Sequence, residues 1–149
     1  MTIYRFLSFL LLSLSIAAVS AGEVVVESIS KTDGPSVAVT EEHRYLSDVT
    51  LYIENDDGSQ TPSGWSTRVA DGAQEERPFA FQPGVNLIKG WTIGVLQMEE
   101  GERALLHVPS ELGYGPKKMG SPGGAFYIPA NSNLLFDLKI LGKVQDEEL

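Results

Sequence analysis

The fold of this chain is decided by Val85 to Gly115, VNLIKGWTIGVLQMEEGERALLHVPSELGYG, which combines a short amphipathic segment, a strand pattern and an aromatic loop. Residues of one helical face recur in its first part at positions i, i+3, i+4 and i+7, namely Ile88, Trp91, Thr92 and Val95. This spacing predicts a short helix that lays one face on a hydrophobic core.

Two glycines, Gly90 and Gly94, lie inside this helix. Each disfavours a helix interior by roughly 1 kcal/mol relative to alanine, so the helix depends on what it packs against. Because glycine has no side chain, these positions also let a sheet approach closely. The run from Arg103 to Val108 predicts a buried strand, and the loop that follows places Tyr114 near the mouth of the sheet.

Further strands are predicted on both sides of this stretch. Glu23 to Ile29 is β-branched, and Asp48 to Ile53 alternates so that Tyr52 faces away from its apolar neighbours. Phe79 to Phe81 is a short strand with two rings on one face, and Leu134 to Leu141 alternates most clearly. Antiparallel strands crossed by one short helix give an α+β architecture.

Two polar segments are predicted to be loops. Gly58 to Arg77 is rich in glycine and serine and lacks periodicity, which indicates a long loop that is either functional or mobile. Trp65 lies within it, and a lone loop tryptophan either caps an apolar edge or lines a site. Lys117 to Gly124, KKMGSPGG, is predicted to be a flexible loop.

Both ends of the chain resemble sorting signals. Met1 to Ala21 has one basic residue, an apolar run and small residues at its end, as in a secretory signal peptide. A membrane anchor is the alternative, but the run is shorter than the roughly 20 apolar residues that a spanning helix needs. Asp146 to Leu149, DEEL, resembles the endoplasmic-reticulum retrieval tetrapeptide, with aspartate in place of lysine or histidine. We therefore expect a signal peptide over 1–21, one domain over 22–144 and an acidic tail over 145–149.

Composition argues against several classes of function. The formal net charge is −9, which disfavours a nucleic-acid partner, and the chain has no cysteine for thiol catalysis or disulfides. The sequence has no GxSxG, HExxH or phosphate-binding glycine motif. His43 and His107 are far apart in sequence, and we expect structural roles for them, with no metal and no cofactor.

Several motifs together resemble the FKBP-type peptidyl-prolyl cis-trans isomerases. They are PFAF at Pro78 to Phe81, LIKGW at Leu87 to Trp91, Gly101 after MEE, LGYG at Leu112 to Gly115, and IPANSNLLFDLKIL at Ile128 to Leu141. The likeness covers about half of the chain closely, and Val49 to Gly58 more loosely. The resemblance implies an antiparallel sheet half-wrapped around one short helix.

The resemblance also implies a proline-binding pocket. Trp91 would be its floor, the backbone N–H of Ile88 and the hydroxyl of Tyr114 would donate hydrogen bonds, and Tyr127 would lie at the rim. The remaining residues implied by the resemblance as walls or as substrate contacts are Tyr52, Phe79, Phe81, Leu87, Ile128 and Phe136. Taken singly, any of these residues is better explained as part of the core.

One departure from the family pattern concerns the segment after the acidic turn. Members of the family typically have a phenylalanine followed by an aspartate that reaches into the pocket. Here Ser59 to Arg68 contains no acid, and Trp65 and Ser66 are the candidates for those two positions.

Two functions of different classes follow. The first is a monomeric secretory-pathway isomerase of the endoplasmic-reticulum lumen, or a secreted one, that accelerates X–Pro rotation in folding polypeptides. The second is a catalytically weak FKBP-like chaperone or peptide-binding module, which holds proline-containing or apolar segments. Macrolide immunosuppressants are expected to bind with reduced affinity, because the pocket aspartate is missing.

Overall fold

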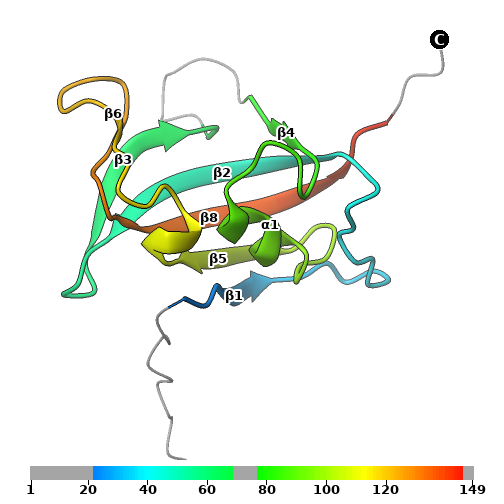
Figure 1. Ribbon diagram of the computed structural model, residues 1–149. Helices are drawn as coiled ribbons and strands as arrows, with labels where there is room; N and C mark the ends of the chain where they lie inside the picture. The colour runs from blue at the N-terminus through cyan, green and yellow to red at the C-terminus, as the bar shows by residue number, and fades with distance from the viewer. Residues whose placement is uncertain (1–21, 69–76, 146–149) are drawn as a thin grey trace, which may run out of the picture.

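The computed structural model describes residues 22–68 and 77–145 (Figure 1). The predicted signal peptide, the predicted retrieval tetrapeptide and residues 69–76 of the predicted long loop lie outside these ranges. Within the described ranges, no helix is long and apolar enough to cross a bilayer, and no cluster of three or more metal-ligating side chains occurs.

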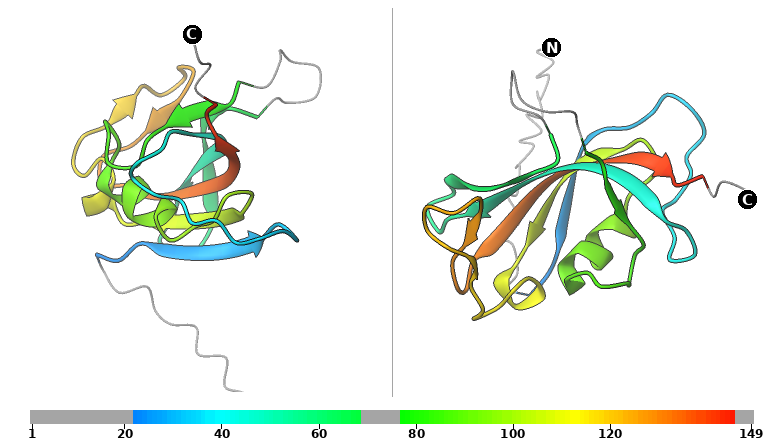
Figure 2. Two further views of the ribbon diagram at one scale, coloured as in Figure 1. Left: turned by 90° about the vertical axis from the view of Figure 1, so that its right-hand side faces the viewer. Right: turned by 90° about the horizontal axis from the view of Figure 1, so that it is seen from above.

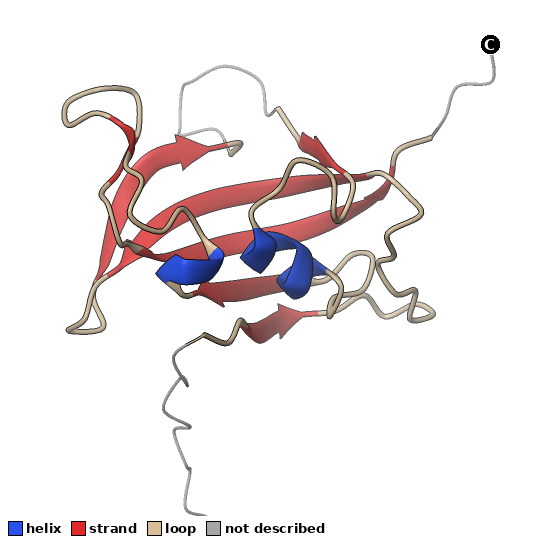
Figure 3. Ribbon diagram, in the orientation of Figure 1, coloured by secondary structure: helices blue, strands red, loops and turns tan. Residues whose placement is uncertain are grey.

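The described strands form one antiparallel sheet and one small hairpin (Figures 1 and 3). The order across the sheet is β1-β5-β8-β2-β3, and β4 pairs with one end of β2. The strands of the sheet are β1 (Val25–Ser30), β2 (Tyr45–Glu54), β3 (Gln60–Ser66), β4 (Phe79–Phe81), β5 (Arg103–Val108) and β8 (Asn133–Lys143). The hairpin joins β6 (Met119–Gly120) to β7 (Tyr127–Ile128).

Helix α1 (Lys89–Val95) lies against the inner face of the sheet, which curves around it (Figure 2). A Cβ added at Gly90 would collide with Val108, and one added at Gly94 would collide with Leu106, both on β5. The two glycines therefore allow the close approach that the sequence predicts. A short 3₁₀ helix, η1 (Ser110–Leu112), follows β5 in the loop predicted after that strand.

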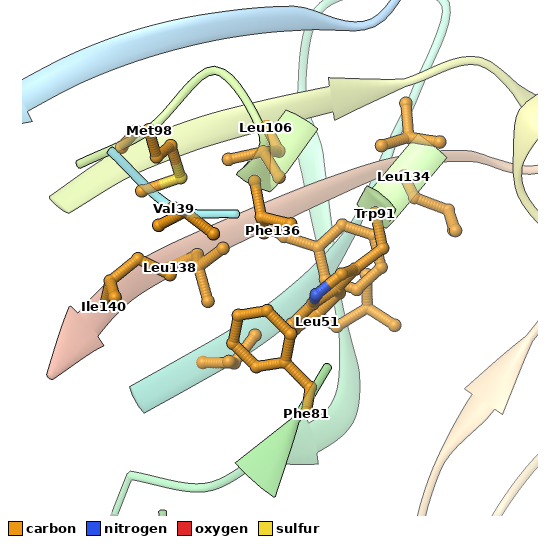
Figure 4. Close-up of a cluster of buried hydrophobic side chains, with 14 of the residues drawn as sticks. Val39, Leu51, Phe81, Trp91, Met98, Leu106, Leu134, Phe136, Leu138 and Ile140 are labelled. Atoms are coloured by element: carbon orange, nitrogen blue, oxygen red, sulfur yellow. The ribbon is translucent and has the colours of Figure 1, made fainter. Parts of the chain in front are cut away.

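The core lies between α1 and the inner face of the sheet (Figure 4). Alternation along β2 is strict, since Val49, Leu51 and Ile53 are buried while Thr50 and Tyr52 are half-buried on the outer face. Leu51 pairs with Phe136 on β8, so both side chains point toward the helix. The predicted α+β sheet with one short helix is confirmed.

The predicted loop from Gly58 to Arg77 is wrong over its first part, because β3 pairs there with β2. The register moves two residues along β2, from Tyr52 to Thr50, while it moves four along β3, from Pro62 to Ser66. This irregularity removes the alternation that marks a strand in sequence.

The predicted loop from Lys117 to Gly124 also contains ordered pairing. Met119 pairs with Ile128 and Gly120 with Tyr127. Strands of two residues are too short for an alternating pattern to be recognised in sequence.

Candidate functional site

A cavity of about 480 Å³ opens between the start of α1 and the inner face of the sheet. Its base is made of buried side chains from four elements, namely Leu51, Trp91, Ile128 and Phe136. Its partly buried walls are Trp65, Phe79, Leu87, Ile88, Tyr114, Met119 and Phe126, and exposed Asn86 completes the lining. None of the described lining residues carries a carboxylate, an imidazole or a basic group. The cavity is therefore mainly apolar, and its polar side chains are those of Asn86 and Tyr114.

Trp91 is the centre of this cavity's aromatic cluster. Its ring meets Phe136 edge to face at 5.0 Å between centroids, and it meets Phe79 at 5.6 Å. Phe81 packs on the indole from the core side, also at 5.6 Å (Figure 4). The buried indole Nε1 has no hydrogen-bond partner among the described residues. These contacts hold the indole in one orientation at the base of the cavity.

Two hydrogen-bond donors border the cavity. Ile88 is the N-cap residue of α1, and its backbone N–H donates to no acceptor within the described part of the chain. The Tyr114 hydroxyl likewise has no hydrogen-bond partner among the residues described. A phenol is already neutral near pH 7, and burial raises the pKa of Tyr114 further because it disfavours the phenolate, so the group is a neutral donor.

The irregularity in β3 carries Trp65 to the cavity. The Ser63 hydroxyl donates to the Leu51 carbonyl at 2.7 Å and accepts from the Trp65 N–H at 3.1 Å. Gly64 adopts φ +88°, a conformation that suits glycine. The Trp65 ring then meets Phe79 edge to face at 5.8 Å, so this tryptophan lines the cavity.

The β6–β7 hairpin adds the remaining wall. A Cβ placed on Gly64 would lie 2.5 Å from the Ala125 carbonyl oxygen and 3.2 Å from the Phe126 Cα. The hairpin therefore rests directly on the β3 backbone. This contact brings Met119 and Phe126 to the cavity beside Trp65.

The family model for FKBP-type peptidyl-prolyl cis-trans isomerases matches residues 49–141, which include β3, β4, β5 and α1 whole and most of β2 and β8. The chain belongs to this family. Of the curated relatives, FK506-binding protein 1 of Gibberella zeae is 36% identical over 113 residues, covering 75% of this chain and 90% of its own.

Other FKBP relatives differ in how much of this chain and of their own chain is aligned. The chloroplastic peptidyl-prolyl cis-trans isomerase FKBP13 of Arabidopsis thaliana is 40% identical over 74 residues, or 45% of this chain and 36% of that protein. A crystal structure of AtFKBP13 superposes with a TM-score of 0.61 at 26% identity, covering 81% of this chain and 93% of that one. This chain spans only 4% of FK506-binding protein 5 of Dictyostelium discoideum.

The structure brings seven of the ten residues implied by the FKBP resemblance together around the cavity. They are Phe79, Leu87, Ile88, Trp91, Tyr114, Ile128 and Phe136. Their roles in binding and turnover stay predictions, which the experiments below test.

Tyr52, Phe81 and Tyr127 do not line the FKBP cavity. Tyr52 points to the outer face because side chains alternate along β2, and Leu51 takes the position assigned to it. Phe81 is buried behind Trp91, where it stacks with Phe79 at 6.5 Å. Tyr127 precedes Ile128 on β7, and alternation turns it away from the cavity that Ile128 lines.

Ser66 does not take the place of the FKBP aspartate. Its hydroxyl lies 2.8 Å from the Thr50 hydroxyl on the outer face of the sheet. The cavity is therefore lined on this side by the indole of Trp65 and by no carboxylate among the described residues.

Four lining residues escaped prediction from sequence. Leu51 could have been predicted from the sequence, because the period of two places it on the same face of the strand as Val49 and Ile53, and this face meets the helix. Asn86 lies in a bend, Met119 in a two-residue strand and Phe126 just before another, so no periodic pattern marks a direction for any of them.

Proposed function

We propose that this protein catalyses cis-trans isomerisation of X–Pro peptide bonds. The observation that carries the proposal is an apolar, aromatic cavity with two donors, the Ile88 N–H and the Tyr114 hydroxyl, at its border, neither of which has an acceptor among the described residues. A proline ring fits such an apolar space over the Trp91 indole. The peptide group that precedes it would then lie near the two donors.

The chemistry follows from amide resonance. Rotation about the C–N bond has a barrier of about 18–20 kcal/mol, because the twisted form loses its partial double bond. The planar amide is more polar than the twisted one, so transfer into an apolar cavity costs the planar form more. Donors placed for the twisted geometry add to this difference, and each 1.36 kcal/mol of it gives about tenfold in rate.

No acid, base or nucleophile takes part in this mechanism. The cavity provides desolvation, shape and two hydrogen bonds, and the Tyr114 phenol, whose pKa burial raises further above its ordinary value, is a neutral donor near pH 7. The absence of ionisable lining groups other than this phenol, among the described residues, is consistent with such a reaction.

The test is turnover of a Leu-Pro-Phe p-nitroanilide peptide by the folded protein. Chymotrypsin cleaves the trans peptide only, so its coupled assay reports the conversion of cis to trans. We expect acceleration that grows linearly with protein concentration. Well-folded protein that leaves the uncatalysed rate unchanged would rule out the enzyme.

A second function, a binding module with little turnover, is favoured by one observation. The described lining has no carboxylate, and Ser66 points to the opposite face of the sheet. For the same reason we propose reduced affinity for FK506-type macrolides, for which the relatives are named. Binding of a proline peptide without turnover would favour this module over the isomerase.

We also propose that the protein works in the secretory pathway, on newly made chains in the endoplasmic-reticulum lumen. The proposal rests on Met1 to Ala21 and on Asp146 to Leu149 as sorting signals. Uncatalysed proline isomerisation takes tens of seconds or more, so folding chains there would benefit from an isomerase.

Expression of the full chain and of a chain lacking Glu147 to Leu149 tests retention. We expect the truncated protein to accumulate in the medium and the full chain to stay in the cell. Equal secretion of the two proteins would contradict retrieval, and failure of both to enter the pathway would contradict the signal peptide.

A further inference from the structure

A partly buried carboxylate on the outer face of the sheet joins β8, β5 and the segment that follows β3. Asp137 lies on β8, next to Phe136 in sequence, and its side chain is only 13% exposed. Arg103 of β5 binds it through two hydrogen bonds, of 2.9 Å and 2.7 Å. Arg68, just beyond the end of β3, binds it at 2.9 Å and 3.1 Å. Burial by itself would raise the pKa of Asp137, but the hydrogen bonds and charges of Arg103 and Arg68 favour the carboxylate and outweigh it, so the pKa is lowered.

The two arginines differ in what they hold. Arg103 ties together β5 and β8, which also share a continuous ladder of six residue pairs. Arg68 ties the end of β3 to β8, although these strands are not neighbours and β2 lies between them. It also donates to the Thr50 hydroxyl of β2 at 3.4 Å.

Arg68 lies three residues after Trp65, on the far side of the irregularity in β3. On the near side, Ser63 is fixed by its bond to the Leu51 carbonyl. Next to Arg68, the Thr67 N–H donates to the Val49 carbonyl at 2.9 Å, and the Thr67 hydroxyl accepts from the Val49 N–H at 2.8 Å. The segment that turns the indole toward the cavity is thus held at both ends. Of these bonds, the one between Arg68 and Asp137 is an ion pair.

We propose that Arg68, held by Asp137, is a positioning residue that fixes Trp65 as a wall of the cavity and so sets how tightly the substrate binds. This inference rests on the proposed function for its kinetic consequence. Its structural consequence, the orientation of Trp65, does not depend on turnover.

The kinetic test compares Arg68→Ala with Arg103→Ala. Each variant removes one guanidinium from Asp137, but only the first releases β3. We expect Arg68→Ala to raise KM for the Leu-Pro-Phe peptide about threefold to tenfold, the range that corresponds to loss of one aromatic contact, with kcat little changed. Arg103→Ala should change KM by less than about twofold, and Arg68→Lys, which keeps the charge, should restore part of the loss.

The structural test uses the two tryptophans of the chain. Protein labelled with 5-fluorotryptophan gives two fluorine resonances, and Trp65→Phe assigns them. We expect Arg68→Ala to shift or broaden the Trp65 resonance and to leave the Trp91 resonance in place, while Arg103→Ala moves neither. Urea unfolding of each variant confirms that the folded protein is observed.

An unmoved Trp65 resonance in Arg68→Ala overturns the inference, as does an equal rise of KM in the two alanine variants. If the unmutated protein has no turnover, the proposed isomerase function fails, and the fluorine resonances still decide the positioning role. Should Arg68→Ala fail to fold, Arg68→Gln, which keeps a polar side chain of similar length, is measured in its place by the same criteria.

Discussion

Trp91→Leu is expected to lower kcat/KM for the Leu-Pro-Phe peptide at least tenfold, while the protein still unfolds cooperatively. The indole is 3% exposed, forms the base of the cavity and meets three phenylalanine rings. An edge-to-face pair contributes about 0.5–1.5 kcal/mol, and each 1.36 kcal/mol lost from the transition state costs about tenfold in rate. The cavity left behind should cost about 2–4 kcal/mol of unfolding free energy.

Met98→Ala is the matched control. Met98 is 1% exposed and belongs to the same core, but it does not line the cavity. It should lose a similar amount of stability, about 2–5 kcal/mol, with kcat/KM of the folded protein unchanged. If Trp91→Leu unfolds the domain, or if both variants lose the same activity, the main contribution of Trp91 is to the stability of the core, and a specific role in turnover is contradicted.

Gly64→Ala is expected to destabilise the protein by about 2–5 kcal/mol and to raise KM. The left-handed conformation at φ +88° costs alanine about 1–2 kcal/mol relative to glycine. The new Cβ would also lie 2.5 Å from the Ala125 carbonyl oxygen, a backbone atom that moves only with the hairpin. Such overpacking costs about 1–3 kcal/mol and displaces Phe126 from the cavity. Urea unfolding and the coupled assay measure the two effects.

Gly58→Ala separates the two causes. Gly58 has φ +81°, close to that of Gly64, but nothing lies within 4 Å of its added Cβ. Gly58→Ala should therefore lower the free energy of unfolding only by the cost of the left-handed backbone conformation, about 1–2 kcal/mol, and should leave KM unchanged. Equal losses in the two variants would mean that the hairpin contact at Gly64 carries no energy.

The pH dependence of stability has a defined sign at Asp137. Its pKa is lowered in the folded protein, so the stability that it contributes is present above the unfolded value and is lost as the pH falls through the folded one. Arg68 and Arg103 remain charged over that range, so acid should weaken both of their bonds to Asp137 together.

The sequence by itself determined the helix and the main strands. Gly90 and Gly94 sit in a short amphipathic segment, and they face β5 as their lack of side chains requires. Alternation is strict along β2, so the period of two already placed Leu51 and Tyr52 on opposite faces. The family resemblance implied that Tyr52 is a wall of the cavity, whereas the alternation along the strand correctly predicted that Tyr52 faces away from Leu51.

Only the tertiary structure decided the outer wall of the cavity. Trp65 reaches it because Ser63 bonds to the Leu51 carbonyl and Gly64 accepts a left-handed turn. Met119 and Phe126 reach it because a hairpin with two-residue strands rests on that glycine. Such contacts join residues far apart in the chain and leave no periodic pattern in the sequence. Local propensity therefore carries no information about them, and the packed backbone alone sets where these side chains point.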